Sequence, residues 1–298
     1  MRYEPGNDQA EGLRRLLARS AARVVTVVGA REGLGATSVV VNLAAQWASE
    51  GKRVLVLDEH VSASNVPNQL GLKHRYDALN VVRGDKQLSE VMLAGGNGVC
   101  VLPAARAMQA LPRLEAAERE RLLGVLRQAA HGMDVVLVDA AAREGHSVSA
   151  SLSGDEPLLM VLNGTASGIT ESYAMLKQMA LQNGRSSFDI VVNKVKGESE
   201  ARAIFDNMAQ LALRNLQVRL EYMGYIPVDE KLKRATQLCQ PVAEAFPGGQ
   251  CAGAFAAVAQ NLMQVSGSDE EEGGGLVGLM QRLISRQHSM GNVVAAIT

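Results

Sequence analysis

The sequence predicts an α/β fold, a doubly wound and mostly parallel sheet with helices on both faces. Short apolar runs, typical of strands that helices cover on both sides, alternate along the chain with amphipathic helical segments. A glycine-rich turn at residues 29–38, GAREGLGATS, joins the first apolar run to an apolar helix. With 298 residues, 47% of them hydrophobic, the chain can bury one large core, so a single α/β domain is expected.

Each element is predicted from its local pattern. Strands are assigned to short apolar runs between polar turns. They are expected at residues 24–28, 53–58, 98–103, 134–139, 158–162, 188–193 and 218–226. Helices are assigned where apolar residues recur every three or four positions among charged ones. They are expected at residues 39–45, 76–94, 114–126, 167–182, 198–213, 230–238 and 253–265.

The composition excludes several classes of protein. A net charge of −1 gives no broad attraction for nucleic acid, so direct nucleic-acid binding is not expected. Cys100, Cys239 and Cys251 are scattered without CxxC spacing, which indicates neither a disulfide framework nor a zinc site and fits a reduced compartment. No leader pattern precedes the first strand, and no apolar run is long enough to cross a bilayer. We expect a cytoplasmic protein, at most peripheral at the inner face of the cell membrane.

The glycine-rich turn has the context of a P-loop, because it follows a buried strand and opens a helix. At such a turn, backbone N–H groups and the helix dipole cradle a phosphate. The pattern G-x-x-x-x-G-K-[ST] would place Gly at position 30 and Lys at position 36, but the chain has Ala30 and Ala36. The turn therefore predicts the shape of a phosphate cradle without most of its charge.

Two predicted strands end in a carboxylate, Asp58 and Asp139. Open α/β sheets place their sites at the carboxyl ends of strands. Asp139 follows four apolar residues, which is the Walker B pattern, whose carboxylate reaches the Mg²⁺ of a bound nucleotide. His60 lies in the polar loop after the first of these strands, where a lone histidine is usually just solvated.

The two ends of the chain differ from the α/β domain at residues 23–265. Residues 1–22 are a polar, basic arm in which Asp8 can cap a short amphipathic helix that either lies on the domain or binds a partner. Residues 266–275 are acidic and rich in Gly and Ser, as in a flexible linker. Residues 276–298 begin with an amphipathic helix that is expected to touch a membrane surface or a partner, or to dock on the domain. Its apolar face consists of Leu276, Leu279, Met280, Leu283 and Ile284.

These motifs, which span nearly the whole chain, resemble the MinD/ParA branch of P-loop ATPases, and within it the FlhG/FleN group of flagellar-number regulators. The most specific element is the run 8–14, DQAEGLR, which matches the D-Q-A-x-x-L-R motif of that group. The runs at 168–174, 192–195 and 224–229 follow the order of the same group. In that group the N-terminal motif stimulates an FlhF-type flagellar GTPase, and the terminal helix is a membrane-targeting sequence. The resemblance therefore implies partner binding by Asp8, Gln9, Ala10, Leu13 and Arg14.

The resemblance also implies a site for ATP or ADP with Mg²⁺. The cofactor-binding residues that it implies are Gly29, Arg31, Gly33, Leu34, Gly35, Ala36, Thr37, Ser38 and Asn193. The metal-binding residues that it implies are Thr37, Asp58 and Asp139, and the two aspartates are also the expected catalytic residues.

The departures from the family pattern fall on the charged positions of that site. In the family loop K-G-G-V-G-K-T, the first Lys crosses a dimer interface to the nucleotide of the partner, and the second contacts the β- and γ-phosphates. Arg31 and Ala36 stand at those positions, and His60 replaces an aspartate that helps to orient the attacking water. One cation on the transferring phosphate is worth on the order of 10³-fold in rate, so we expect weak or absent hydrolysis and weakened nucleotide binding.

The function hypothesis is an FlhG/FleN-like regulator of flagellar number and placement that acts through protein contacts. The implied partners are an FlhF-like GTPase, a flagellar transcription activator or C-ring proteins, a second copy of the chain and, weakly, a membrane surface. One alternative is an active MinD-like ATPase that cycles between a soluble monomer and a membrane-associated dimer. Another is a ParA-like positioner of division sites or DNA, which the D-Q-A motif disfavours. An iron–sulfur protein of the nitrogenase-reductase type is disfavoured by the positions of the three cysteines.

Overall fold

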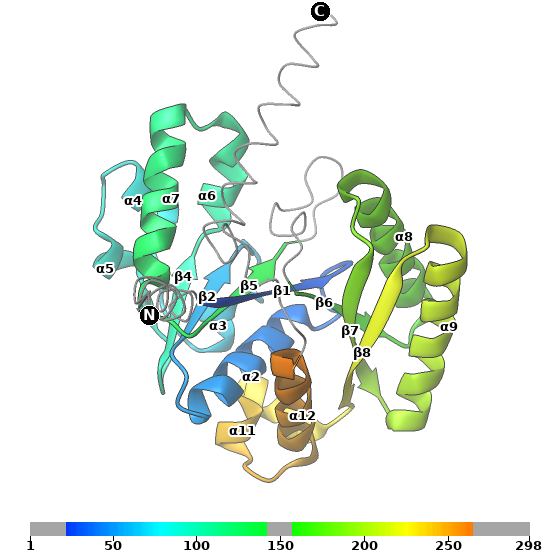
Figure 1. Ribbon diagram of the computed structural model, residues 1–298. Coiled ribbons are helices and arrows are strands. Elements are labelled where there is room, and N and C mark those ends of the chain that lie inside the picture. The colour runs from blue at the N-terminus through cyan, green and yellow to red at the C-terminus, as the bar shows by residue number, and fades with distance from the viewer. Residues whose placement is uncertain (1–21, 142–156, 265–298) are drawn as a thin grey trace, which may run out of the picture.

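Eight strands form one sheet in the order β3-β4-β2-β5-β1-β6-β7-β8 (Figure 1). The computed structural model describes residues 22–141 and 157–264. All neighbouring strands are parallel except β3, which pairs antiparallel with β4 at the edge of the sheet. The predicted fold class is therefore confirmed. The strands are β1 (Arg23–Gly29), β2 (Val54–Asp58), β3 (Leu93–Ala94), β4 (Val99–Pro103), β5 (Val135–Ala140), β6 (Leu158–Asn163), β7 (Ser187–Val195) and β8 (Arg219–Pro227).

Helices cover both faces of this sheet (Figure 1). One face packs against α4, α7, α8 and α9, and the other against α2, α11 and α12. The helices are α2 (Ala36–Ser49), α3 (Val66–Gln69), α4 (Ala78–Val82), α5 (Leu88–Val91), α6 (Ala105–Ala110), α7 (Ala116–Ala130), α8 (Ala166–Asn183), α9 (Glu198–Leu216), α10 (Glu230–Gln237), α11 (Val242–Ala245) and α12 (Gln250–Gln264), with a 3₁₀ turn at Leu111–Arg113. None of the helices in the described ranges has the length and apolarity needed to cross a membrane.

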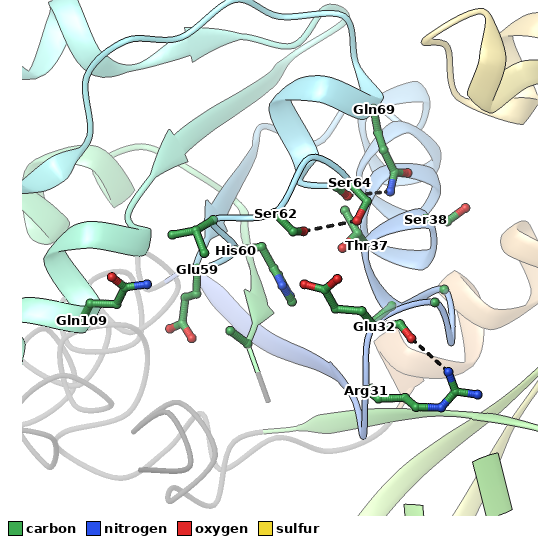
Figure 2. A pocket seen from close by; sticks show the side chains of 16 residues that line it. Arg31, Glu32, Thr37, Ser38, Glu59, His60, Ser62, Ser64, Gln69 and Gln109 are labelled. Carbon is green, nitrogen blue, oxygen red and sulfur yellow. Dashed lines mark hydrogen bonds between the residues drawn. The ribbon is translucent and has the colours of Figure 1, made fainter. Parts of the chain in front are cut away.

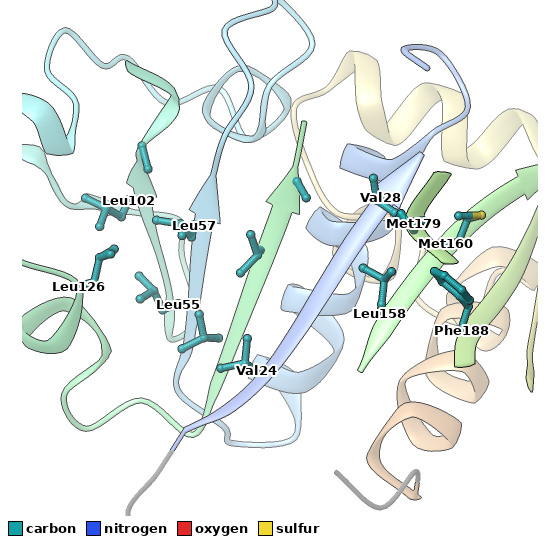
Figure 3. Packing of buried hydrophobic residues seen from close by; sticks show 14 of the residues in the cluster. Val24, Val28, Leu55, Leu57, Leu102, Leu126, Leu158, Met160, Met179 and Phe188 are labelled. Carbon is teal, nitrogen blue, oxygen red and sulfur yellow. The ribbon is translucent and has the colours of Figure 1, made fainter. Parts of the chain in front are cut away.

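The strands are apolar throughout because successive side chains point to opposite, equally covered faces. On β2, Leu55 and Leu57 pack into the core with α7, whereas Val54 and Val56 pack into the core with α2. Figure 3 shows the first of these cores, in which leucines from several strands meet on one side of the sheet. This double burial explains why the apolar runs could be recognised as strands from the sequence.

The prediction of one helix over residues 76–94 is wrong. The segment contains two short helices, α4 and α5, and ends in the short strand β3. The side chain of Asp77 caps α4, and a capping box at Gln87 starts α5 independently. Gly84, with φ of 81°, lies between them in the left-handed region that ends helices. Local capping signals thus override the helical spacing of the apolar residues.

The parallel arrangement brings the carboxyl ends of the central strands to one edge. Asp58 at the end of β2 is the register partner of Asp139 on β5, and Asn163 on β6 is the partner of Asn193 on β7. The loop after β1 lies between these two pairs, because β1 is hydrogen-bonded to both β5 and β6. Polar residues from distant parts of the chain therefore converge at this edge of the sheet.

Candidate functional site

The loop between β1 and α2 has the backbone shape of an anion cradle. Gly33 and Gly35 have φ of 82° and 101°, the left-handed region that glycine adopts without strain. Gly35 is the N-cap of α2, and no side chain caps that helix end. The first amides of α2 are therefore available to a ligand, where the helix dipole favours negative charge.

A cavity of about 250 Å³ opens over this loop (Figure 2). It is bounded by the loop itself, the start of α2, the loop after β2, one residue each from α3 and α6, and the residue that follows β5. The lining residues are Gly29, Arg31, Glu32, Gly33, Gly35, Ala36, Thr37, Ser38, Glu59, His60, Val61, Ser62, Ser64, Gln69, Gln109 and Ala141.

Strand β7 holds the back of the loop through two consecutive residues. The Nδ2 of Asn193 donates to the carbonyl of Leu34 at 2.8 Å, and the Nζ of Lys194 donates to the carbonyl of Gly33 at 2.7 Å. The register of β7 and β8 shifts between Asn193 and Val195, and Lys194 has φ of 59°, which is rare for a residue with a side chain. With two carbonyls engaged from behind, the orientation of the loop peptides is set before any ligand arrives.

The loop has the shape of an anion site, but the cavity lacks the positive charge that such a site usually has. Ala36 stands at the start of α2, where the family pattern has a lysine, and Glu32 places a carboxylate on the cavity wall. Arg31 is drawn toward α8: its Nε lies 2.5 Å from Glu171 Oε2, and its guanidinium contacts the Ser167 hydroxyl at 3.5 Å. Both partners of this ion pair are about half exposed, so its net worth is at most about 1 kcal/mol. Lys194 does approach the loop, but its Nζ donates to the carbonyl of Gly33.

The two strand-ending carboxylates lie side by side and are fully buried. Asp58 is 1% exposed and Asp139 is 0% exposed. His60 contacts both residues: its backbone N–H donates to Asp58 Oδ1 at 3.1 Å, and its Nε2 lies 3.5 Å from Asp139 Oδ1. Glu59, which is 2% exposed, lies between Asp58 and His60 in the sequence. Its backbone N–H donates to the Asp139 carbonyl at 3.1 Å. His60 therefore contacts two buried carboxylates, with Glu59 next to it in the chain.

The surroundings shift the pKa values of this group. Burial raises the pKa of Asp58 to about 7, and the charge of Asp139 adds to that effect. Burial by itself would lower the pKa of His60, but its contact with Asp139 and the charges of Asp58 and Glu59 outweigh burial and raise the pKa to about 9. At neutral pH the imidazole is therefore a cation, whereas the Asp58 carboxyl is close to its own pKa and is partly protonated.

The predicted site residues fall into three sets. Seven of the implied cofactor-binding residues line the cavity: Gly29, Arg31, Gly33, Gly35, Ala36, Thr37 and Ser38. Leu34 and Asn193 lie behind the loop, and Asp58 and Asp139 are buried beneath the cavity wall. The arm residues Asp8, Gln9, Ala10, Leu13 and Arg14 and the terminal residues Leu276, Leu279, Met280, Leu283 and Ile284 lie outside the described residues.

Several residues of the site were not predicted. Glu32 could have been found, because it stands at a glycine of the family loop. Lys194 lies in a run that the resemblance included, but its reach to Gly33 depends on the irregularity of β7. Gln69 and Gln109 carry no local signal, since they come from α3 and α6 and meet only through the fold.

The residues present fit the phosphate part of a nucleotide better than its metal. Free helix N-terminal amides and two left-handed glycines form a cradle that suits phosphate oxygens. Neither Asp58 nor Asp139 reaches the surface of the cavity. Within residues 22–141 and 157–264, no three His, Cys, Asp or Glu side chains are grouped so that they could hold a metal ion.

Comparisons with known proteins agree with the fold. The chain is 34% identical over 240 residues to the antiactivator FleN of Pseudomonas aeruginosa, covering 80% of this chain and 86% of FleN. It is 24% identical to the flagellum site-determining protein YlxH of Helicobacter pylori, over 71% of this chain and 72% of YlxH. The septum site-determining protein MinD of Pyrococcus horikoshii, solved with Mg-ADP, superposes with a TM-score of 0.62 at 21% identity, covering 84% of this chain and 100% of MinD. Residues 25–242 match the model of the CobQ/CobB/MinD/ParA nucleotide binding domain, and the chain belongs to that family.

Proposed function

We propose that this protein is a regulator of flagellar number and placement of the FlhG/FleN type that acts through protein contacts. Its nucleotide site binds ATP or ADP weakly and hydrolyses ATP slowly or not at all. The flagellum site-determining protein YlxH supports the flagellar role, and the 34% identity to the antiactivator FleN supports the FlhG/FleN type. The absence of a loop lysine supports the reduced hydrolysis.

The observation that carries the proposal is the combination of an intact cradle with a missing cation. Ala36 occupies the first position of α2, and Glu32 adds a negative charge to the cavity wall. Catalysis of phosphoryl transfer depends almost entirely on positioning and on neutralising the charge of the transferring group. The geometry of the loop supports retained positioning, and Ala36 with Glu32 supports the loss of charge neutralisation.

The partners follow from the two ends of the chain and from the relatives. The arm motif at residues 8–14 would bind an FlhF-like GTPase, and FleN is named an antiactivator, which favours a flagellar transcription activator as a second partner. C-ring proteins and a second copy of the chain are further partners in this proposal. The helix that begins at Leu276 would bring the protein weakly to a membrane surface, so that it is cytoplasmic and peripheral.

Phosphate release tests the proposal most directly. The full chain is assayed with ATP and Mg²⁺, alone and with lipid vesicles and an FlhF-type GTPase held in a GTP-free state, and ATP affinity is measured by calorimetry. We expect wild-type release near background, at least about 100-fold below a lysine-containing MinD-type protein. Ala36→Lys should raise ATP affinity, whereas Ala36→Met, with a long neutral side chain, should not. Wild-type turnover equal to that of the lysine-containing protein would instead support an active MinD-like ATPase.

A further inference from the structure

The His60 side chain separates the cavity from the carboxylate beneath it. His60 lines the cavity, and its side chain is 16% exposed, whereas the Asp139 side chain is 0% exposed. In Figure 2 the imidazole points into the space between the loop after β2 and the glycine-rich loop. A ligand entering over Thr37 therefore meets the imidazole ring before it can meet Asp139.

His60 contacts both of the carboxylates behind it. Within the described part of the chain, neither oxygen of Asp139 accepts a hydrogen bond, and the His60 Nε2, 3.5 Å from Asp139 Oδ1, makes no hydrogen bond of its own. Asp58 on β2, the register partner of Asp139, accepts a hydrogen bond from the His60 backbone N–H at 3.1 Å. The backbone of His60 is thus tied to one of the two buried carboxylates, and its ring lies against the other.

We infer that His60 stands in for the divalent ion at Asp58 and Asp139, so that a nucleotide in this cavity is bound without help from magnesium. The inference rests on the proposed function for the identity of the ligand and refines it by naming the metal-free nucleotide as the bound form. His60 is then a specificity-determining residue: the ring takes the position next to Asp139 that a metal ion would need. It also ties the loop after β2 to β5, so this loop does not depend on a metal ion for its position.

The test measures how much Mg²⁺ changes nucleotide affinity. ADP is titrated into the full chain with excess Mg²⁺ and again with EDTA. The variants are His60→Asp, which restores the family carboxylate, and His60→Asn, which removes the ring without adding charge. His74→Asp is the matched control, because it makes the same substitution at an exposed residue outside the cavity.

For wild type and His74→Asp we expect ADP affinities that agree within about threefold with and without Mg²⁺, as a site without a metal requires. His60→Asp and His60→Asn should bind ADP at least about tenfold more tightly with Mg²⁺ than without, because removal of the ring lets Asp58 and Asp139 reach a metal ion. A tenfold effect of Mg²⁺ in wild type, or none in both His60 variants, would overturn the inference. If ADP binding is too weak to measure, thermal melting with Mn²⁺ alone decides the same question: Mn²⁺ should raise the melting temperature of the His60 variants and leave that of wild type unchanged.

The inference and the proposed function can fail separately. Rapid phosphate release by wild type would remove the claim of impaired hydrolysis, whatever the melting curves with Mn²⁺ show. A strong effect of Mg²⁺ on ADP affinity would remove the role of His60 and leave a flagellar regulator with slow turnover intact.

Discussion

At the scale of single residues, the two glycines of the cradle loop are required for different reasons. Gly33 and Gly35 both have positive φ, but their surroundings differ. A Cβ at Gly33 would meet no atom within 4 Å, whereas a Cβ at Gly35 would overlap the Nδ2 of Asn193. That amide is fixed by its hydrogen bond to the Leu34 carbonyl. Gly35 is therefore required by contact as well as by backbone conformation.

Substituting alanine at each glycine separates these two requirements. Gly33→Ala should lower the free energy of unfolding by about 1 kcal/mol, the cost of a left-handed backbone for a residue with a Cβ. Gly35→Ala should lower it by about 2–4 kcal/mol, because overpacking against Asn193 adds to that strain. Urea denaturation of both variants measures the difference. Equal losses would show that Asn193 yields freely and does not hold the loop.

At the scale of elements, Asn42 links the helix of the cradle to the carboxyl-terminal part of the domain. Its Nδ2 donates to the Ser38 carbonyl within α2 at 2.7 Å, and its Oδ1 accepts from the Val242 N–H at the start of α11 at 2.7 Å. Asn42 is 5% exposed, so these bonds are made away from water. The two segments are 200 residues apart in the chain, and one amide side chain satisfies polar groups in both.

Removing this amide should lower the free energy of unfolding by more than the loss of an average hydrogen bond does. Asn42→Ala leaves the Val242 N–H buried without its partner, so we expect a loss of about 1–3 kcal/mol in the free energy of unfolding. Asn68→Ala is the control, because the Asn68 side chain makes an exposed bond to the Ala63 carbonyl and should cost less than about 1 kcal/mol. Chemical denaturation compares the two, and hydrogen exchange at Val242 should accelerate in the first variant alone. Similar losses in both variants would contradict the linking role of Asn42.

At the scale of the whole molecule, the proposed function assigns partner and membrane binding to the two ends of the chain. The domain between them then acts as a scaffold. The P-loop region keeps its geometry while its charges are changed at Ala36, Glu32 and His60. A domain with this fold and little turnover can still present the arm and the terminal helix to partners. The contribution of the arm can therefore be measured without reference to nucleotide turnover.

The arm motif is tested by the GTPase activity of its proposed partner. In the full chain, Gln9→Ala with Leu13→Ala should reduce stimulation of an FlhF-type GTPase by at least about tenfold, because an amide and an apolar anchor that the motif supplies are both lost. Gln128→Ala, an exposed change on α7, is the control and should leave stimulation unchanged. A melting temperature equal to that of wild type would show that the domain is intact. Full stimulation by the double variant would remove this role from the arm.

The amino-acid sequence by itself determined the fold class, the position of the cradle and the placement of Asp58 and Asp139 at the carboxyl ends of strands; that these two strands are neighbours came from the structure. These features are local patterns: doubly covered strands are apolar throughout, and a glycine-rich turn stands where a strand meets a helix. The segment at 76–94 could not be read this way, since caps at Asp77 and Gln87 overrode its helical spacing.

Only the tertiary structure decided which partners the charged side chains of the site contact and how the buried carboxylates are separated from the cavity. The contact of His60 with Asp139, the pairing of Arg31 with Glu171 and the reach of Lys194 to Gly33 all join residues that are distant in the chain. Each depends on the register of the strands, a shift between β7 and β8 or a side-chain rotamer. These are set by packing of the whole sheet, and no local pattern encodes them.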